Sequence, residues 1–111
     1  YAAHMRALHA RRFETIGKAV DAGVRVFAGT DAGTVIPHGL IADEVELLGR
    51  VGGAEFALGA ASWRARDWLG ADGLDEGASA DLVVYDADPR SDLSVVRHPR
   101  LVILRGRVVR E

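Results

Sequence analysis

The hydrophobic pattern over the first 22 residues is helical. Apolar residues recur at steps of three or four, or at sums of these steps, so a helix over residues 2–22 would place them on one face. These residues are Met5, Phe13, Ile16 and Val20. Gly23 follows, at a position where glycine commonly ends a helix. The pattern therefore predicts one long helix at the start of the chain.

A short apolar run comes directly after this helix. Residues 24–28 read Val-Arg-Val-Phe-Ala, rich in β-branched residues and bounded by Gly29, which predicts a buried strand. Residues 32–39 contain two glycines, a proline and a histidine, and follow neither the helical nor the strand period. We expect a loop there.

The middle of the chain carries two more helical patterns. Apolar residues share a face over residues 41–51, and Gly52-Gly53 interrupts the pattern. A second helix is predicted over residues 54–69, with an inward stripe of alanines that ends at Trp68. Small residues in such a stripe allow close packing against a neighbouring element.

The last third of the chain favours antiparallel β-structure. Glycine and acidic residues over 71–80 indicate turns, and residues 81–86 then form a predicted strand. Residues 100–104 and 107–110 are apolar runs on either side of Arg105-Gly106. This arrangement is typical of a β-hairpin.

Composition narrows the class of protein. The 111 residues are 49% hydrophobic and 27% charged, which is typical of globular domains. A net charge of −2 provides no positive field to gather nucleic acid or anionic lipid, so we expect neither a nucleic-acid nor a membrane partner. The absence of cysteine excludes disulfides and Cys-ligated zinc, and is consistent with a reducing, cytoplasmic compartment.

Three motifs in the correct order resemble the metal-dependent amidohydrolase superfamily. Residues 20–33 are similar to the helix, strand and G-T-D-A-G loop near the end of that family's barrel. Residues 57–70 resemble its A-L-x-x-A-T…A-x-x-L-G helix, and residues 80–89 and 102–109 resemble its closing β-strands. The G-T-D-A-G loop followed by His38-Gly39 looks most like the imidazolonepropionase-like and prolidase-like branch.

The resemblance implies an α/β fold. The chain would supply the last strand and flanking helices of a (β/α)₈ TIM barrel, followed by closing antiparallel strands of a small β-sandwich. Residues 1–70 would then end the barrel domain, and residues 71–111 would belong to the sandwich. Because such a barrel needs roughly 200 to 250 residues, we expect a C-terminal fragment that is inactive alone and whose partner is the missing N-terminal part of the barrel.

Asp31 is the main candidate for chemistry. From the residues alone, an acid just past a buried strand is most simply an Asx-turn residue that closes the strand. The resemblance implies instead that Asp31 is a metal ligand and the base that accepts the proton of a metal-activated water. It also implies that His38 contributes to the substrate pocket, against the alternative of an exposed loop histidine. Thr30 could support Asp31 by a hydrogen bond or could simply pack at the strand end.

Other pairs of residues in the sequence give little indication of a binding site. His4 and His9 are five residues apart, whereas two ligands on one helix face need a spacing of three or four. Trp63 and Trp68 are also five apart, which favours packing over ligand stacking. The family's remaining metal ligands, a His-x-His pair, a Lys or Glu and two further histidines, are absent from the sequence.

The sequence thus predicts part of a hydrolase that cleaves a C–N bond in an amide, cyclic amide or dipeptide-like substrate. The expected cofactor is a divalent metal, zinc or a similar ion, in one or two copies. We expect the intact enzyme to be a homo-oligomer. Two alternatives stay open: a ring-amidine deaminase of the same superfamily, and a non-catalytic stand-alone module.

Overall fold

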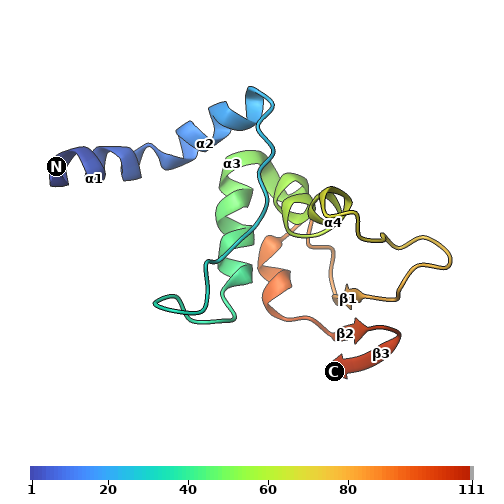
Figure 1. The fold of residues 1–111 in the computed structure, drawn as a ribbon. Coiled ribbons are helices and arrows are strands. Elements are labelled where there is room, and N and C mark those ends of the chain that lie inside the picture. Colours follow the sequence, from blue (N-terminus) through green and yellow to red (C-terminus); the bar gives the residue numbers. More distant parts are fainter. Residues whose placement is uncertain (111) are drawn as a thin grey trace.

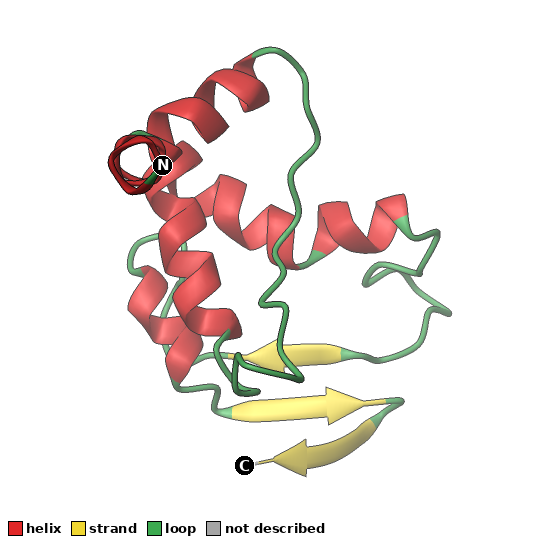
Figure 2. Ribbon diagram, turned by 60° about the vertical axis from the view of Figure 1, so that its left-hand side comes forward, coloured by secondary structure: helices red, strands yellow, loops and turns green. Residues whose placement is uncertain are grey.

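The computed structural model describes residues 1–110 as a group of helices beside a three-stranded antiparallel sheet (Figures 1 and 2). The elements in chain order are α1 (Ala2–Ala10), α2 (Arg12–Asp21), α3 (Ile41–Ala61), α4 (Trp63–Trp68), β1 (Leu82–Val84), the 3₁₀ helix η1 (Leu93–Arg97), β2 (Leu101–Leu104) and β3 (Arg107–Arg110). Among the described residues, none of the helices is both long enough and apolar enough to cross a bilayer.

The first predicted helix is divided in two. α1 ends at Ala10 and α2 begins at Arg12, so the expectation of one continuous helix over residues 2–22 is wrong. The Arg12 guanidinium donates a hydrogen bond to the His9 carbonyl, at 2.7 Å, and so satisfies one of the last carbonyl groups of α1. α1 has no buried residue and projects from the body of the molecule (Figure 1).

The two middle helices have a different boundary from the predicted one. α3 runs through Gly53 with a kink, and a break at Ser62 then separates α3 from α4. Gly53 has φ 85° and ψ 177°, a conformation that is essentially restricted to glycine. The Gly52-Gly53 interruption is therefore confirmed as a kink, whereas the break at Ser62 has no comparable sequence signal.

The buried core is small and lies on α3. Among the described residues, the buried hydrophobic side chains are Val45, Leu48, Ala57 and Ala60. Partly buried residues pack against them: Phe56 and Leu58 of α3 itself, Val26 and Ala28 of the α2–α3 connection, and Leu93 and Val96 of η1. Alanine at the centre lets the connecting segment approach the α3 backbone closely. The Ala28 N–H therefore donates to the Ala60 carbonyl, at 3.0 Å.

The predicted fold class is wrong for this structure. Residues 24–28 are extended but pair with no strand, so the expected barrel strand does not form. The one sheet of the described residues is antiparallel and comes entirely from β1, β2 and β3. A parallel strand needs neighbouring strands to satisfy its backbone, and residues 1–110 supply none beside residues 24–28. The structure is thus four α-helices and a single small sheet, without a barrel or a second sandwich layer among the described residues.

The antiparallel strands and the hairpin are confirmed. The strand order is β1-β2-β3, with Leu82 opposite Ile103 and a register shift between Val102 and Ile103. Arg105 and Gly106 both have positive φ, as a two-residue hairpin turn requires. Among the described residues, the buried cluster on α3 contains no residue of the three strands.

Candidate functional site

The candidate site is the connection between α2 and α3. Asp31 lies in this connection, exposed and two residues after Gly29. Its φ is 51°, which makes it one of two non-glycine residues with positive φ in the described chain. Left-handed backbone costs roughly 1 kcal/mol or more for most residues and is best tolerated by Asn and Asp. The Asp31 carboxylate is therefore held at a turn whose left-handed backbone Asp tolerates better than most residues.

The residues after Asp31 fold back into a compact turn. Ala32 and Ile36 form an isolated bridge, and the Gly33 N–H donates to the Ile36 carbonyl at 3.1 Å. Gly33 has φ 133°, which only glycine adopts readily. The loop predicted over residues 32–39 is confirmed, and its closing bridge leaves Asp31 at the base of the turn.

The other two predicted site residues lie in the same connection. Thr30 is half-buried and precedes Asp31, whereas His38 is exposed and follows the turn. Within residues 1–110 no hydrogen bond joins Asp31 to Thr30 or to His38. Their roles as supporting residue and substrate contact therefore stay predictions.

The metal expected from the resemblance does not fit the described residues alone. Residues 1–110 contain no group of three His, Asp or Glu side chains that could hold a metal ion. Asp31 and His38 would supply at most one carboxylate and one imidazole, and a catalytic zinc site needs three protein ligands. A metal centre at Asp31 would need ligands from outside the described chain.

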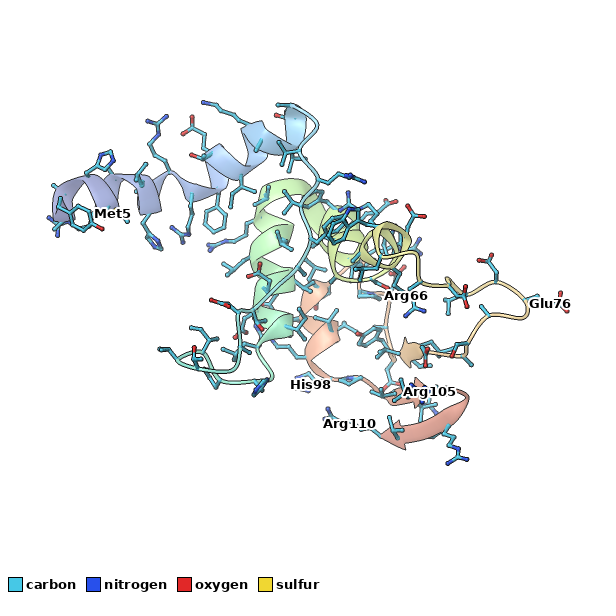
Figure 3. The ribbon with its side chains drawn as sticks, viewed as in Figure 1. Met5, Arg66, Glu76, His98, Arg105 and Arg110 are labelled. Carbon is cyan, nitrogen blue, oxygen red and sulfur yellow. The ribbon has the colours of Figure 1, made fainter. Side chains whose placement is uncertain are left out.

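The remaining histidines form no cluster. His4 and His9 lie on exposed α1. Figure 3 places His98 beside η1 and the sheet, away from α1. His98 follows η1 directly, and its N–H donates to the Val95 carbonyl, in agreement with a structural role at a turn.

A shallow groove of about 300 Å³ lies next to the connection. Its apolar wall includes the stacked rings of Phe27 and Trp68, whose centroids are 5.0 Å apart at 26°. Arg25, Arg64 and Asp67 line the same groove. Packing was expected of Trp68, but its partner Phe27 lies far away in the chain and could not be predicted from the sequence.

An ion-pair network was also missed. Arg97 of η1 contacts the Asp43 carboxylate at 2.6 Å and the Glu46 carboxylate at 2.7 Å, both on α3. The hydrogen bond from Arg97 lowers the pKa of Glu46 below its ordinary value, and the two acids raise the pKa of Arg97. The spacing of Asp43 and Glu46, three residues apart on a helix, was the available signal for a shared cation. The network joins η1 to α3 and is structural.

The known proteins that this chain resembles are much longer than the chain itself. No family model matches the chain. It is 60% identical over 108 residues to uncharacterized proteins of Mycobacterium bovis and of two strains of Mycobacterium tuberculosis. The match covers 96% of this chain and 29% of each relative. The chain thus spans less than a third of the length of the curated relatives it matches, and the amidohydrolase resemblance stays a prediction.

Proposed function

We propose that this chain contributes Asp31 to the active site of a longer metal-dependent hydrolase that cleaves a C–N bond in an amide, cyclic amide or dipeptide-like substrate. The proposal rests on the G-T-D-A-G motif at residues 29–33 and on one structural observation. That observation is the positive φ of Asp31, a non-glycine residue in the left-handed backbone region. Non-glycine residues in this region are concentrated at functional sites.

Asp31 has the chemistry of a general base. Its carboxylate is exposed and accepts no hydrogen bond from residues 1–110, so its lone pairs are available to a water molecule or a substrate N–H. A positioned carboxylate that takes a proton from attacking water and returns it to the leaving nitrogen contributes typically about 10² to 10⁴ in rate. This is the role we assign to Asp31.

The turn after Asp31 also supports the proposal. Its glycines leave the backbone around the carboxylate open, because neither Gly29 nor Gly33 has another atom within 4 Å of the place a Cβ would occupy. A substrate could approach this side of the loop closely. His38 lies on the same loop, and we assign it to substrate binding, with Thr30 as the residue that supports Asp31.

A divalent ion such as zinc, if bound, would lower the pKa of a coordinated water to about 7. Its ligands other than Asp31 would have to lie outside residues 1–110, for the reason given above. We further propose that the intact protein is a cytoplasmic homo-oligomer.

A chimera tests the function in a protein of full length. The 108 matching residues of an intact Mycobacterium tuberculosis relative are replaced by those of this chain. The chimera is assayed for cleavage of N-acyl amides, cyclic amides and dipeptides, and its bound metal is measured by elemental analysis. We expect hydrolysis of at least one class and stoichiometric metal.

Two matched substitutions test the role of Asp31 as the base. Asp31→Asn is expected to lower kcat about 100-fold or more, because Asn cannot accept the proton. Asp72→Asn is the control, because Asp72 is also an exposed loop acid and only its backbone carbonyl is used, by Arg66 at 2.6 Å. It is expected to retain activity within about twofold. Equal rates for the two variants would refute the role of Asp31. Ammonia release from a ring amidine without amide cleavage would favour the deaminase instead.

A further inference from the structure

The turn that follows Asp31 is closed by one backbone hydrogen bond. The Gly33 N–H donates to the Ile36 carbonyl at 3.1 Å, and Ala32 and Ile36 form a bridge beside it. Among residues 29–39 of the described chain, this is the one hydrogen bond between two backbone groups. The backbone next to Asp31 is therefore held by Gly33 and not by another backbone contact of the loop.

Gly33 makes this bond with an unusual backbone conformation. Its φ is 133°, a value that residues with a side chain rarely adopt. A Cβ at this position would meet no atom within 4 Å, so the need for glycine comes from the backbone and not from crowding. Gly29, on the other side of Asp31, has no positive φ. The residue next to the Asp31 turn that must be glycine is thus Gly33.

Asp31 depends on the closed turn for its own conformation. Its φ of 51° lies in the left-handed region, and a free L-residue prefers negative φ about fivefold or more. If the turn opened, Asp31 would be free to return to negative φ. The direction in which its Cα–Cβ bond leaves the backbone would then change, and the carboxylate would move with it. The closing of the turn therefore decides where the carboxylate lies.

We propose that Gly33 is a positioning residue for Asp31. By closing the turn, it holds Asp31 in the left-handed conformation in which the Asp31 carboxylate serves as the base. The catalytic part of this inference rests on the proposed function, whereas the control of the Asp31 backbone by Gly33 does not. A side chain at position 33 opens the turn, and only the fraction of molecules in which Asp31 is still left-handed stays active.

The chimera tests the effect on the reaction. Gly33→Ala should lower kcat about fivefold or more and leave KM within about twofold, because fewer molecules hold the base in place while substrate binding is unchanged. Gly77→Ala is the matched control. Gly77 also has a positive φ, 90°, in a turn that the Ala78 N–H closes on the Asp75 carbonyl, and a Cβ there would also meet no atom within 4 Å. It should carry a similar backbone cost and yet keep kcat within about twofold.

Nuclear magnetic resonance of the 111-residue chain tests the conformation without substrate. The N–H and Hα hydrogens of one residue lie closer together at positive φ than at negative φ, so Asp31 should show a strong nuclear Overhauser effect between them. Gly33→Ala should weaken this effect, and Gly77→Ala should leave it unchanged. Gly33→D-alanine, made by chemical synthesis, adds the same methyl group but should keep the effect, because a D-residue adopts positive φ readily.

Three results would overturn the inference. The first is an unchanged Overhauser effect at Asp31 in Gly33→Ala. The second is its loss in the D-alanine variant as well, which would assign the change to the added methyl group. The third is equal kcat for Gly33→Ala and Gly77→Ala in an active chimera. If the chimera hydrolyses nothing, the proposed function fails, and the Overhauser comparison still decides whether Gly33 holds Asp31.

Discussion

Gly53 fixes the direction change within α3, and its conformation allows a quantitative prediction. Its φ of 85° and ψ of 177° lie in the region that is essentially restricted to glycine. A Cβ built at this position would meet no atom within 4 Å, so steric contact with other residues contributes nothing. Gly53→Ala therefore isolates the backbone cost of the kink.

The expected magnitude follows from the conformation. A non-glycine residue in this region costs roughly 1 to 3 kcal/mol, so the free energy of unfolding of Gly53→Ala should fall by that amount. For a domain of this size, 1 kcal/mol shifts Tm by about 4–8 °C, which predicts a decrease of roughly 4 to 24 °C. The measurement is thermal and urea unfolding of the 111-residue chain, followed by circular dichroism at 222 nm.

Gly17→Ala is the matched control. Gly17 lies inside α2 with ordinary helical backbone, and a Cβ there would also meet no atom within 4 Å. Alanine should raise the free energy of unfolding by about 0.5–1 kcal/mol, through helix propensity alone. If Gly53→Ala stabilised the chain as much as Gly17→Ala does, α3 would be a straight helix, and Gly53 would not hold a kink in it.

Two further predictions concern the contact of η1 with α3. Leu93→Ala should lower the free energy of unfolding by about 2 kcal/mol in urea titrations, since Leu93 packs on the buried cluster while partly exposed; a change below about 0.5 kcal/mol would contradict this packing. Arg97→Met should make the free energy of unfolding depend less steeply on pH at acidic pH. The pKa of Glu46 is lowered in the folded state, so its contribution is present above the unfolded pKa and is lost as pH falls through the folded pKa. Urea midpoints measured between pH 3 and 7 should therefore fall less steeply in the variant, and parallel profiles would show that Arg97 does not hold Glu46.

Local sequence signals predicted the local structure well. The Arg105-Gly106 turn was recognisable because a two-residue hairpin requires positive φ at both positions, and the two flanking strands then pair by adjacency. The Gly52-Gly53 interruption likewise marked the kink in α3. In both cases the information lies within a few residues.

Features that depend on distant residues could not be predicted in this way. The apolar pattern of residues 24–28 is typical of a strand, but a strand forms only where another strand can pair with it. In residues 1–110 the segment packs on α3 instead, through Val26 and Ala28. The Arg97–Glu46 contact joins residues 51 positions apart, so the spacing of the acids on α3 could not identify Arg97 as their partner.

The candidate site was predicted only in part. The motif indicated that Asp31 lies on a loop next to Thr30, and the structure has it there. Its positive φ was not foreseen, because it arises from the closing of the turn between Ala32 and Ile36. The ligands that would complete a metal site are not among residues 1–110, so they could not be predicted from the sequence of this chain.

Whether Asp31 is the base is tested most directly by the ratio of kcat between Asp31→Asn and Asp72→Asn in the full-length chimera, on the amide substrate that the unsubstituted chimera hydrolyses fastest. We expect a ratio of about 0.01 or less, because only Asp31 serves as the base. A ratio near one would contradict it and would assign Asp31 to the structure of the turn.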